Sequence, residues 1–458
     1  MEEKKLKLTF CGGTGTVTGA NFLLEGEGKK FLIDCGLTQS EKLADDMNWK
    51  PFLYDAASID ALFITHAHID HIGRIPKLIH DGFKGKIYST IPTRDLVPIM
   101  LEDTATILSR DTDNHLDEIY TVDNVAKAMS LWNGLGYHEK IEFPGGFTMS
   151  FANAGHILGS GMLEVLYNGK KIVFTGDLGN SPSPILPDTE KITDADYLIM
   201  ESVYGDRNHE DRDERKDMLA QVINDNFKTK GTLIIPTFSL ERTQELLFEI
   251  DNLSSQKKIA VQPIFLDSPL AIRLDAVFKK HEDYFNETAR AILRKGNDMF
   301  DFPGLKVTLE TEQSKMILNT PDPKIIIAGS GMSNGGRIVH HEKNYLPNAN
   351  NTILLVGYQS LGTLGRFIED GNKTVKINGD EIPVRAKVAK IAGYSGHKDS
   401  DGLLAFAGDT AKTVKNIYVV MGEPKSALFL VQKIRDNFNL NASAPLAGDS
   451  VTLDCSFN

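Results

Sequence analysis

Short apolar runs separated by glycine-rich turns fill the first two hundred residues of the chain. The runs at residues 6–13 (LKLTFCGG), 30–36 (KFLIDCG) and 147–156 (FTMSFANAGH) have the length and β-branched or alternating character of strands. Residues 96–112 (LVPIMLEDTATILSRDT) predict a helix. Many strands with few helices between them favour two packed sheets with helices outside.

The pattern changes near residue 206. Residues 212–231 predict an amphipathic helix, residues 231–238 a buried strand and residues 241–253 a second helix. The alternation continues through residues 263–281, 323–332 and 351–359. Strands that alternate with helices predict a parallel sheet with helical crossovers.

Strand pairs return after residue 375, where KINGDEI (376–382) predicts a hairpin turn. A chain of 458 residues exceeds what one hydrophobic core usually holds. We therefore predict an α/β protein in which a parallel-sheet domain (206–375) is inserted into a sandwich domain (1–205 and 376–458). Two independent domains in tandem are the alternative.

The composition is that of a globular protein, with 41% apolar and 24% charged residues. The sequence contains no apolar run long enough to span a bilayer, and MEEKKLKLTF lacks the apolar segment of a secretory signal, so we expect a cytoplasmic protein without a membrane partner. The three cysteines form no CxxC pair, which argues against a disulfide framework. A net charge of −12 argues against general adhesion to nucleic acid but allows a local basic groove.

The densest group of chemically active side chains is in ALFITHAHIDHIGRIP (61–76), which holds His66, His68, Asp70 and His71. Residues two apart in an extended segment point the same way, so His66 and His68 can hold one ion together. Asp70 and His71, where the chain turns toward a helix, would then face a second ion. Imidazole nitrogen and carboxylate oxygen are ligands of zinc, and we predict a catalytic metal site.

Three further residues stand at the ends of strand-like runs: Asp34 in LIDCG, His156 in NAGHILGSG and Asp177 in IVFTGDLGN. Each would be unremarkable alone. In this order, with the HxHxDH cluster, they resemble the motifs of the metallo-β-lactamase superfamily. The resemblance implies an αββα sandwich with one metal on His66, His68, His156 and Asp177. It implies a second metal on Asp70, His71 and a bridging Asp177, with Asp34 orienting the ligands.

The inserted segment and its flanks resemble the β-CASP group of nucleases, and most closely its compact bacterial and archaeal RNA-processing members, which are similar to cleavage-and-polyadenylation nucleases. The resemblance rests on ESVYGDRNHEDRDER from Glu201, IIPTFSLERTQELL from Ile234, FLDSPLA from Phe265, IIIAGSGMSNGGR from Ile325 and YSGHKDSDGLL from Tyr394. It implies hydrolysis of RNA or DNA by a metal-activated water. Asp70 would orient that water, and His397, held by Glu201, would act as general acid. Structural roles for Glu201 and His397 stay open as the alternative.

Two glycine-rich loops, residues 329–336 and 357–366, place backbone amides and hydroxyls after strands, as phosphate-binding loops do. Ordinary tight turns and surface ion pairs would look the same. The residues that we expect to contact substrate are Ser330, Thr363, Arg242, Arg337 and Arg366.

The chain departs from the family pattern at Met421 in IYVVMGEPKSALFL, where the β-CASP group has a histidine ligand. A thioether is a soft, neutral ligand, so the second metal site should be weaker, with water or Glu423 filling the gap. We predict a zinc-dependent nuclease with two ions that cuts single-stranded RNA internally. A 5′ exonuclease mode, manganese as the ion and a homodimer are left open.

Two rival functions remain at this point. Met421 favours a noncatalytic RNA-binding subunit, although such a subunit has no chemical need for six metal ligands. A small-molecule hydrolase of the thioesterase or lactamase type does not explain the insert.

Overall fold

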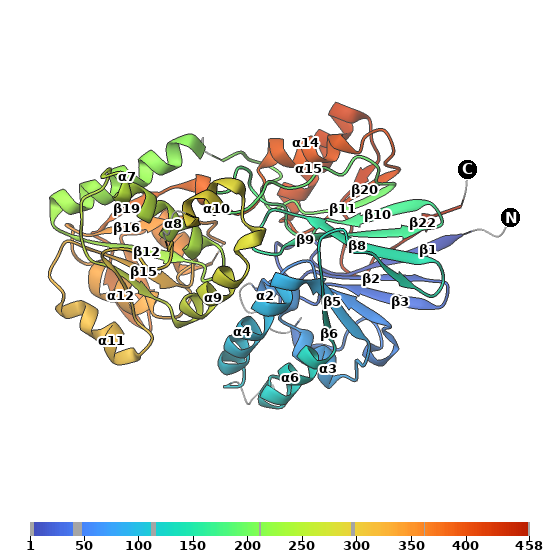
Figure 1. Cartoon of the computed structure of the whole chain (residues 1–458), viewed down its shortest axis with the longest axis horizontal. Helices are drawn as coiled ribbons and strands as arrows, with labels where there is room; N and C mark the ends of the chain where they lie inside the picture. The colour runs from blue at the N-terminus through green and yellow to red at the C-terminus, as the bar shows by residue number, and fades with distance from the viewer. Residues whose placement is uncertain are drawn as a thin grey trace. The chain divides into compact units, whose positions relative to one another are not determined.

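The chain divides into two compact units (Figure 1). The computed structural model describes residues 4–39, 48–110, 116–209, 212–294, 298–360 and 362–456. Unit 1 comprises residues 1–183, 187–208 and 397–458, and unit 2 comprises residues 184–186 and 209–396. Unit 2 is thus inserted into unit 1, and the tandem alternative is wrong.

Unit 1 contains two seven-stranded sheets. The first has the order β22 (Ser450–Asp454), β1 (Lys5–Gly12), β2 (Asn21–Gly26), β3 (Lys29–Ile33), β4 (Ala61–Phe63), β5 (Lys86–Thr90) and β6 (Trp132–Leu135). The second has the order β21 (Ala442–Ser443), β20 (Asn416–Val419), β11 (Tyr197–Met200), β10 (Lys170–Phe174), β9 (Gly161–Tyr167), β8 (Phe147–Asn153) and β7 (Ile141–Phe143). Strands β3 to β6 are parallel, so their carboxyl ends meet at one edge of the first sheet.

The core of unit 1 lies between these two sheets, because alternate residues of each strand face inward. In β1, Leu6, Leu8 and Phe10 are buried, and the rings of Phe31 in β3 and Phe147 in β8 pack 5.0 Å apart across the sheets. Burial of such side chains is the main stabilising contribution to a sandwich.

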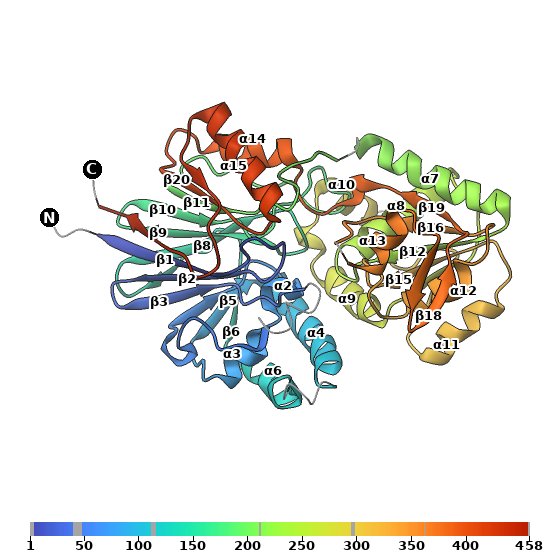
Figure 2. The same cartoon turned by 180° about the vertical axis from the view of Figure 1, so that it is seen from behind.

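Helices cover the outer faces of both sheets (Figures 1 and 2). The helices of unit 1 are α2 (Ile69–Ile72), α3 (Ile75–His80), α4 (Ile91–Leu108), α5 (Leu116–Ile119), α6 (Val122–Ser130), α14 (Ser400–Asp409) and α15 (Pro424–Phe438). Helix α4 is the helix predicted at residues 96–112, but it begins earlier because the Thr90 hydroxyl accepts the Thr93 N–H as an N-cap. The last two predicted residues lie outside the described residues. The αββα architecture is confirmed.

Unit 2 is built on a six-stranded parallel sheet, as predicted. Its order is β14 (Leu305–Val307), β13 (Ile264–Asp267), β15 (Lys324–Gly329), β12 (Thr232–Thr237), β16 (Thr352–Leu355) and β19 (Lys387–Lys390). Its helices are α7 (Arg212–Thr229), α8 (Arg242–Ser255), α9 (Pro269–Lys280), α10 (Glu287–Leu293), α11 (Thr311–Met316), α12 (Ile338–Tyr345) and α13 (Leu364–Glu369).

The predicted hairpin consists of β17 (Thr374–Ile377) and β18 (Asp380–Pro383). It belongs to unit 2, and β19 after it pairs with β16, so the chain returns to unit 1 at His397 rather than near residue 376. The sequence pattern predicted too early a return of the chain to unit 1, because the hairpin resembles the strand pairs of the sandwich domain. Among the described residues, no helix combines the length and the apolar character needed to cross a bilayer.

Candidate metal centre

The loop after β4 carries the densest group of candidate ligands, and its backbone is held on both sides. His68 has extended backbone angles and precedes α2, so Asp70 and His71 occupy the first turn of that helix. The carbonyl of Asp70 accepts the Ala20 N–H at 2.9 Å, and the carbonyl of His71 accepts the Cys35 N–H at 2.8 Å. A Cβ at Gly36 would lie 1.5 Å from the Asp70 carbonyl oxygen, so this close approach requires glycine.

Four side chains from three loops converge on one point. His66, His68, His156 and Asp177 each offer a ligand atom, and these atoms lie within 4.8 Å of one another. The Nε2 atoms of His66 and His156 lie 3.4 and 3.5 Å from Asp177 Oδ2. The same two atoms lie 3.1 and 3.2 Å from His68 Nδ1. Three imidazoles and one carboxylate are a donor set that suits a divalent metal ion.

The electrostatics of this first group also suit a cation. Burial lowers the pKa of His66 and lowers that of His68 and His156 well below the ordinary value, so their rings are neutral and keep a lone pair for an ion. Burial alone would raise the pKa of Asp177, but His71 and His66 hold it well below its usual range. Asp177 is therefore a carboxylate.

A second group shares Asp177 with the first. Asp70, His71 and Asp177 also offer ligand atoms within 4.8 Å of one another. His71 Nε2 lies 3.4 Å from Asp177 Oδ1 and 3.8 Å from Asp70 Oδ2. Both His71 Nε2 and Asp177 Oδ1 are buried without a hydrogen-bond partner. A divalent ion between them would satisfy both atoms, so the residues present fit a metal.

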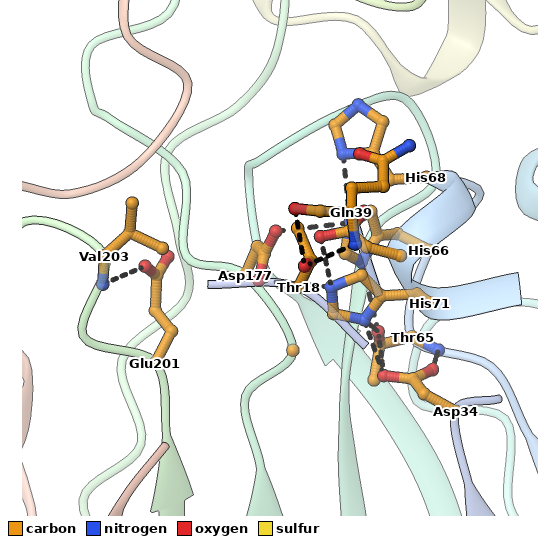
Figure 3. A network of polar contacts seen from close by, with 12 residues as sticks. Thr18, Asp34, Gln39, Thr65, His66, His68, His71, Asp177, Glu201 and Val203 are labelled. Carbon is orange, nitrogen blue, oxygen red and sulfur yellow. Dashed lines mark hydrogen bonds and ion pairs between the residues drawn. The ribbon is translucent and has the colours of Figure 1, made fainter. Parts of the chain in front are cut away.

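Asp34 sits behind the second group and fixes it (Figure 3). Its carboxylate accepts hydrogen bonds of 2.8 Å from the Thr65 N–H, from the Thr65 hydroxyl and from His71 Nδ1. With an ion bound, this hydrogen bond would keep the proton of His71 on Nδ1, so that Nε2, which faces Asp177, is the atom that would bind the ion. The contribution of Thr65 was missed in the sequence, where a threonine at a strand end is unremarkable.

Glu201 and His397 lie together beside the first group. His397 Nδ1 is 3.2 Å from Glu201 Oε1 and 3.9 Å from Asp177 Oδ2, and its ring centroid is 4.6 Å from that of His156. Glu201 is fully buried and accepts the N–H groups of Leu178 and Val203.

The environment shifts the pKa of three acid–base groups here. Burial raises the pKa of Glu201, and it raises that of Asp70 to about 6. Burial disfavours the charged form of His397, but the Glu201 carboxylate outweighs it and raises the pKa of His397 to about 9.

Met421 lies close to the second group but offers no nitrogen to it. The residue is 1% exposed, has a left-handed φ of 47° and donates its N–H to the Gly13 carbonyl. Its side chain lines a small cavity together with Asp34, Thr65 and His71. Glu423 is absent from the groups of converging ligand atoms among the described residues, so the structure does not support its role as a replacement ligand.

The five residues predicted to contact substrate all have partners inside unit 2. The buried Arg242 pairs with Glu245, and Arg366 pairs with Asp370 at 2.9 Å. Arg337 donates to the buried Asp267 at 2.7 Å and to the carbonyls of Thr308 and Leu309. The Ser330 hydroxyl accepts the Asn334 N–H, and the Thr363 hydroxyl caps α13. These bonds give each residue a structural role, and phosphate contact stays a prediction.

The fold and the ligand groups agree with three family models. The model of the Metallo-beta-lactamase superfamily matches residues 14–222, that of the Beta-Casp domain matches residues 243–368, and that of the Zn-dependent metallo-hydrolase RNA specificity domain matches residues 381–445. The chain belongs to the β-CASP group of the metallo-β-lactamase superfamily, and divalent-metal binding is a property of this fold.

Several curated relatives cover nearly the whole chain. Ribonuclease TTHA0252 of Thermus thermophilus is 35% identical over 425 residues, which is 93% of this chain and 95% of the relative. The RNase J-like protein of Methanocaldococcus jannaschii is 32% identical, covering 96% and 98%. Transcription termination factor FttA of Pyrococcus horikoshii is 30% identical, covering 98% and 71%.

A solved structure shares the fold. The crystal structure of a protein of unknown function from Enterococcus faecalis V583 aligns with a TM-score of 0.59 at 13% identity, and the alignment covers 98% of this chain and 100% of that chain.

Proposed function

We propose that this chain is a zinc-dependent ribonuclease that hydrolyses phosphodiester bonds within single-stranded RNA. The observation that carries the proposal is that His66, His68 and His156 on one side and Asp70 and His71 on the other converge on Asp177. His71 Nε2 and Asp177 Oδ1 are buried there without a hydrogen bond. The relatives named as ribonucleases support RNA as the substrate. A homodimer and a cytoplasmic location stay predictions.

His66, His68, His156 and Asp177 would hold one ion, and Asp70, His71 and Asp177 a second. Ions bound there would lower the pKa of a water molecule and neutralise charge on the phosphate oxygens. The first set is rich in nitrogen, which favours zinc, whereas two of the three residues in the second are carboxylates, which manganese also accepts.

The chain's own residues supply orientation and protons. Asp70 would orient the attacking water, whose oxygen forms the new bond to phosphorus as the bond to the leaving oxygen breaks. Glu201 engages His397 Nδ1 at 3.2 Å, so the proton for the leaving oxygen would come from Nε2. The N–H groups of Leu178 and Val203 fix Glu201 in that position.

Met421 favours one alternative, a noncatalytic RNA-binding subunit. A buried methionine in place of a histidine removes one protein ligand of the second ion. The six other candidate ligand side chains offer converging atoms, and this convergence supports the enzyme.

A circular single-stranded RNA tests the proposal and its endonucleolytic mode, because a circle has no end for an exonuclease. We expect the zinc-loaded protein to open the circle, and His66→Ala, loaded in the same way, to leave it closed. Binding of the circle without opening, with zinc and with manganese, would favour the noncatalytic alternative.

A further inference from the structure

Unit 2 contains a cavity of about 440 Å³ that no part of the proposed chemistry uses. It lies between the loop after β15, the start of α13 and strand β17. Its lining includes Asn334, Leu364, Phe367 and every residue from 374 to 378. A run of five consecutive residues along one wall means that the edge of β17, rather than one face, borders the cavity.

That edge of β17 carries unused backbone groups. The hairpin closes with a two-residue turn in which Asn378 and Gly379 have φ of 51° and 87°, so the flanking pair Ile377 and Asp380 exchanges hydrogen bonds. In an antiparallel hairpin every second residue pair exchanges hydrogen bonds, and the bond from the Val384 N–H to the Lys373 carbonyl fits this alternation. The N–H and C=O of Thr374 and Lys376 therefore point away from β18, and β17 has no second neighbour among the described strands.

An aromatic ring and amide side chains stand at the same cavity. Phe367 lines it with 44% of its surface exposed, which is unusual for a phenylalanine. Asn334, Asn372 and Asn378 are exposed lining residues with amide groups. The buried Val339 and Val375 complete an apolar floor.

Lysines outnumber acidic side chains without an ion pair at this hairpin. Asp370 pairs with Arg366, Glu369 with Lys390 and Asp380 with Lys343. Within the described part of the chain, neither Lys373 nor Lys376 forms an ion pair, although Glu381 stands opposite Lys376 in the hairpin register. Two exposed lysines thus stand on or next to the wall of the cavity.

We propose that this cavity binds one nucleotide of a single-stranded RNA. The base stacks on Phe367, its hydrogen-bonding edge meets the N–H and C=O of Lys376, and Lys373 and Lys376 contact the phosphates. The inference rests on the proposed function, because it takes the substrate to be RNA. An extended peptide would also use the open edge of β17, but the exposed ring, the amides and the lysines favour a nucleotide.

Photocrosslinking tests the site directly. The full chain, treated with chelator so that RNA is not cut, is irradiated with a short oligouridylate that carries 4-thiouridine, and the crosslinked peptides are sequenced. We expect crosslinks at Phe367 or within residues 372–378. Their absence from this segment, with crosslinks elsewhere, would overturn the proposal and leave an extended peptide as the partner for β17.

Affinity measurements separate stacking from charge. Phe367→Ala should weaken binding of the same RNA by about fivefold to a hundredfold, and Phe367→Trp should restore it. Lys376→Ala should lower RNA affinity and reduce the steepness of log affinity against log salt concentration by about 0.7. Lys412→Ala, which replaces an exposed lysine of unit 1, should lower RNA affinity less than Lys376→Ala does. Equal effects of the two lysine variants, or unchanged affinity of Phe367→Ala, would contradict the site.

The proposal and the proposed function fail in different ways. Crosslinks at the cavity, in a protein whose metal-loaded form does not cut RNA, would refute the ribonuclease and keep the nucleotide site. Cleavage of RNA without crosslinks at the cavity would refute the site and keep the ribonuclease.

Discussion

Replacing Asp34 by asparagine should weaken the second ion without removing any ligand. The carboxylate accepts three hydrogen bonds of 2.8 Å, and the one from His71 Nδ1 sets the tautomer that leaves Nε2 open. An asparagine can still accept the Thr65 N–H with its carbonyl. Its NH₂ then faces His71 Nδ1, so the ring must carry its proton on Nε2, where an ion would bind.

The structure sets the expected magnitude. One charge-assisted hydrogen bond in a buried site is worth about 1.5–3 kcal/mol. Loss of such a bond behind a metal ligand corresponds to a decrease in metal affinity of about 10- to 100-fold. Among the candidate ligands only His71 bonds Asp34 directly, whereas His66 is connected to it through the Thr65 hydroxyl, 3.1 Å from His66 Nδ1. The second ion should therefore weaken by this factor and the first ion by less.

Zinc titration in a metal buffer, with the bound metal counted by mass spectrometry, measures the two affinities. Asp60→Asn is the matched control, because Asp60 also accepts a backbone N–H at a strand edge of the same unit but lies away from the ligands. Two ions bound by Asp34→Asn with unchanged affinities would refute the role assigned to the Asp34 bond.

Three other predictions concern separate parts of the chain. Met421→His should raise the affinity of the second ion and bring the bound zinc closer to two per chain, because it adds an imidazole beside His71; unchanged stoichiometry and affinity would contradict the assignment of Met421 as the missing ligand. His397→Asn should lower kcat on RNA by about 10²- to 10⁴-fold with little change in RNA affinity, whereas the exposed control His80→Asn should change neither. Burial raises the pKa of Glu342 to about 8, above its value of 4.5 in an unfolded chain. The contribution of this group to the free energy of unfolding is therefore full below about pH 4.5. It is lost as the pH rises to about 8, at about 1.4 kcal/mol per pH unit. Glu342→Gln should flatten the pH dependence of the free energy of unfolding in that range, and a curve parallel to that of the unchanged protein would contradict the shift.

Local patterns indicated most of the candidate ligands that the fold brings together. The residues from His66 to His71 are close in sequence and sit at a strand end followed by a helical turn, so their geometry follows from backbone periodicity alone. His156 and Asp177 come from distant loops, and only the order of motifs along the chain connected them to the cluster. The alternation of strand and helix after residue 206 likewise predicted the parallel sheet.

Features that depend on long-range contacts could not be predicted. The two bonds from Thr65 to Asp34 and the cavity beside β17 arise from segments brought together by the fold. Arg337 was expected at a phosphate, but its ion pair with Asp267 joins residues seventy positions apart. An arginine in a glycine-rich loop gives no sign of such a partner.

Cleavage of a 5′-labelled single-stranded RNA by the zinc-reconstituted protein, beside Asp70→Asn, tests the central claim most directly. Internal fragments that appear with the unchanged protein, increase with added zinc or manganese and disappear in Asp70→Asn are the predicted result. Intact RNA under both metals, with binding preserved, would contradict the account and assign the chain to the noncatalytic RNA-binding alternative.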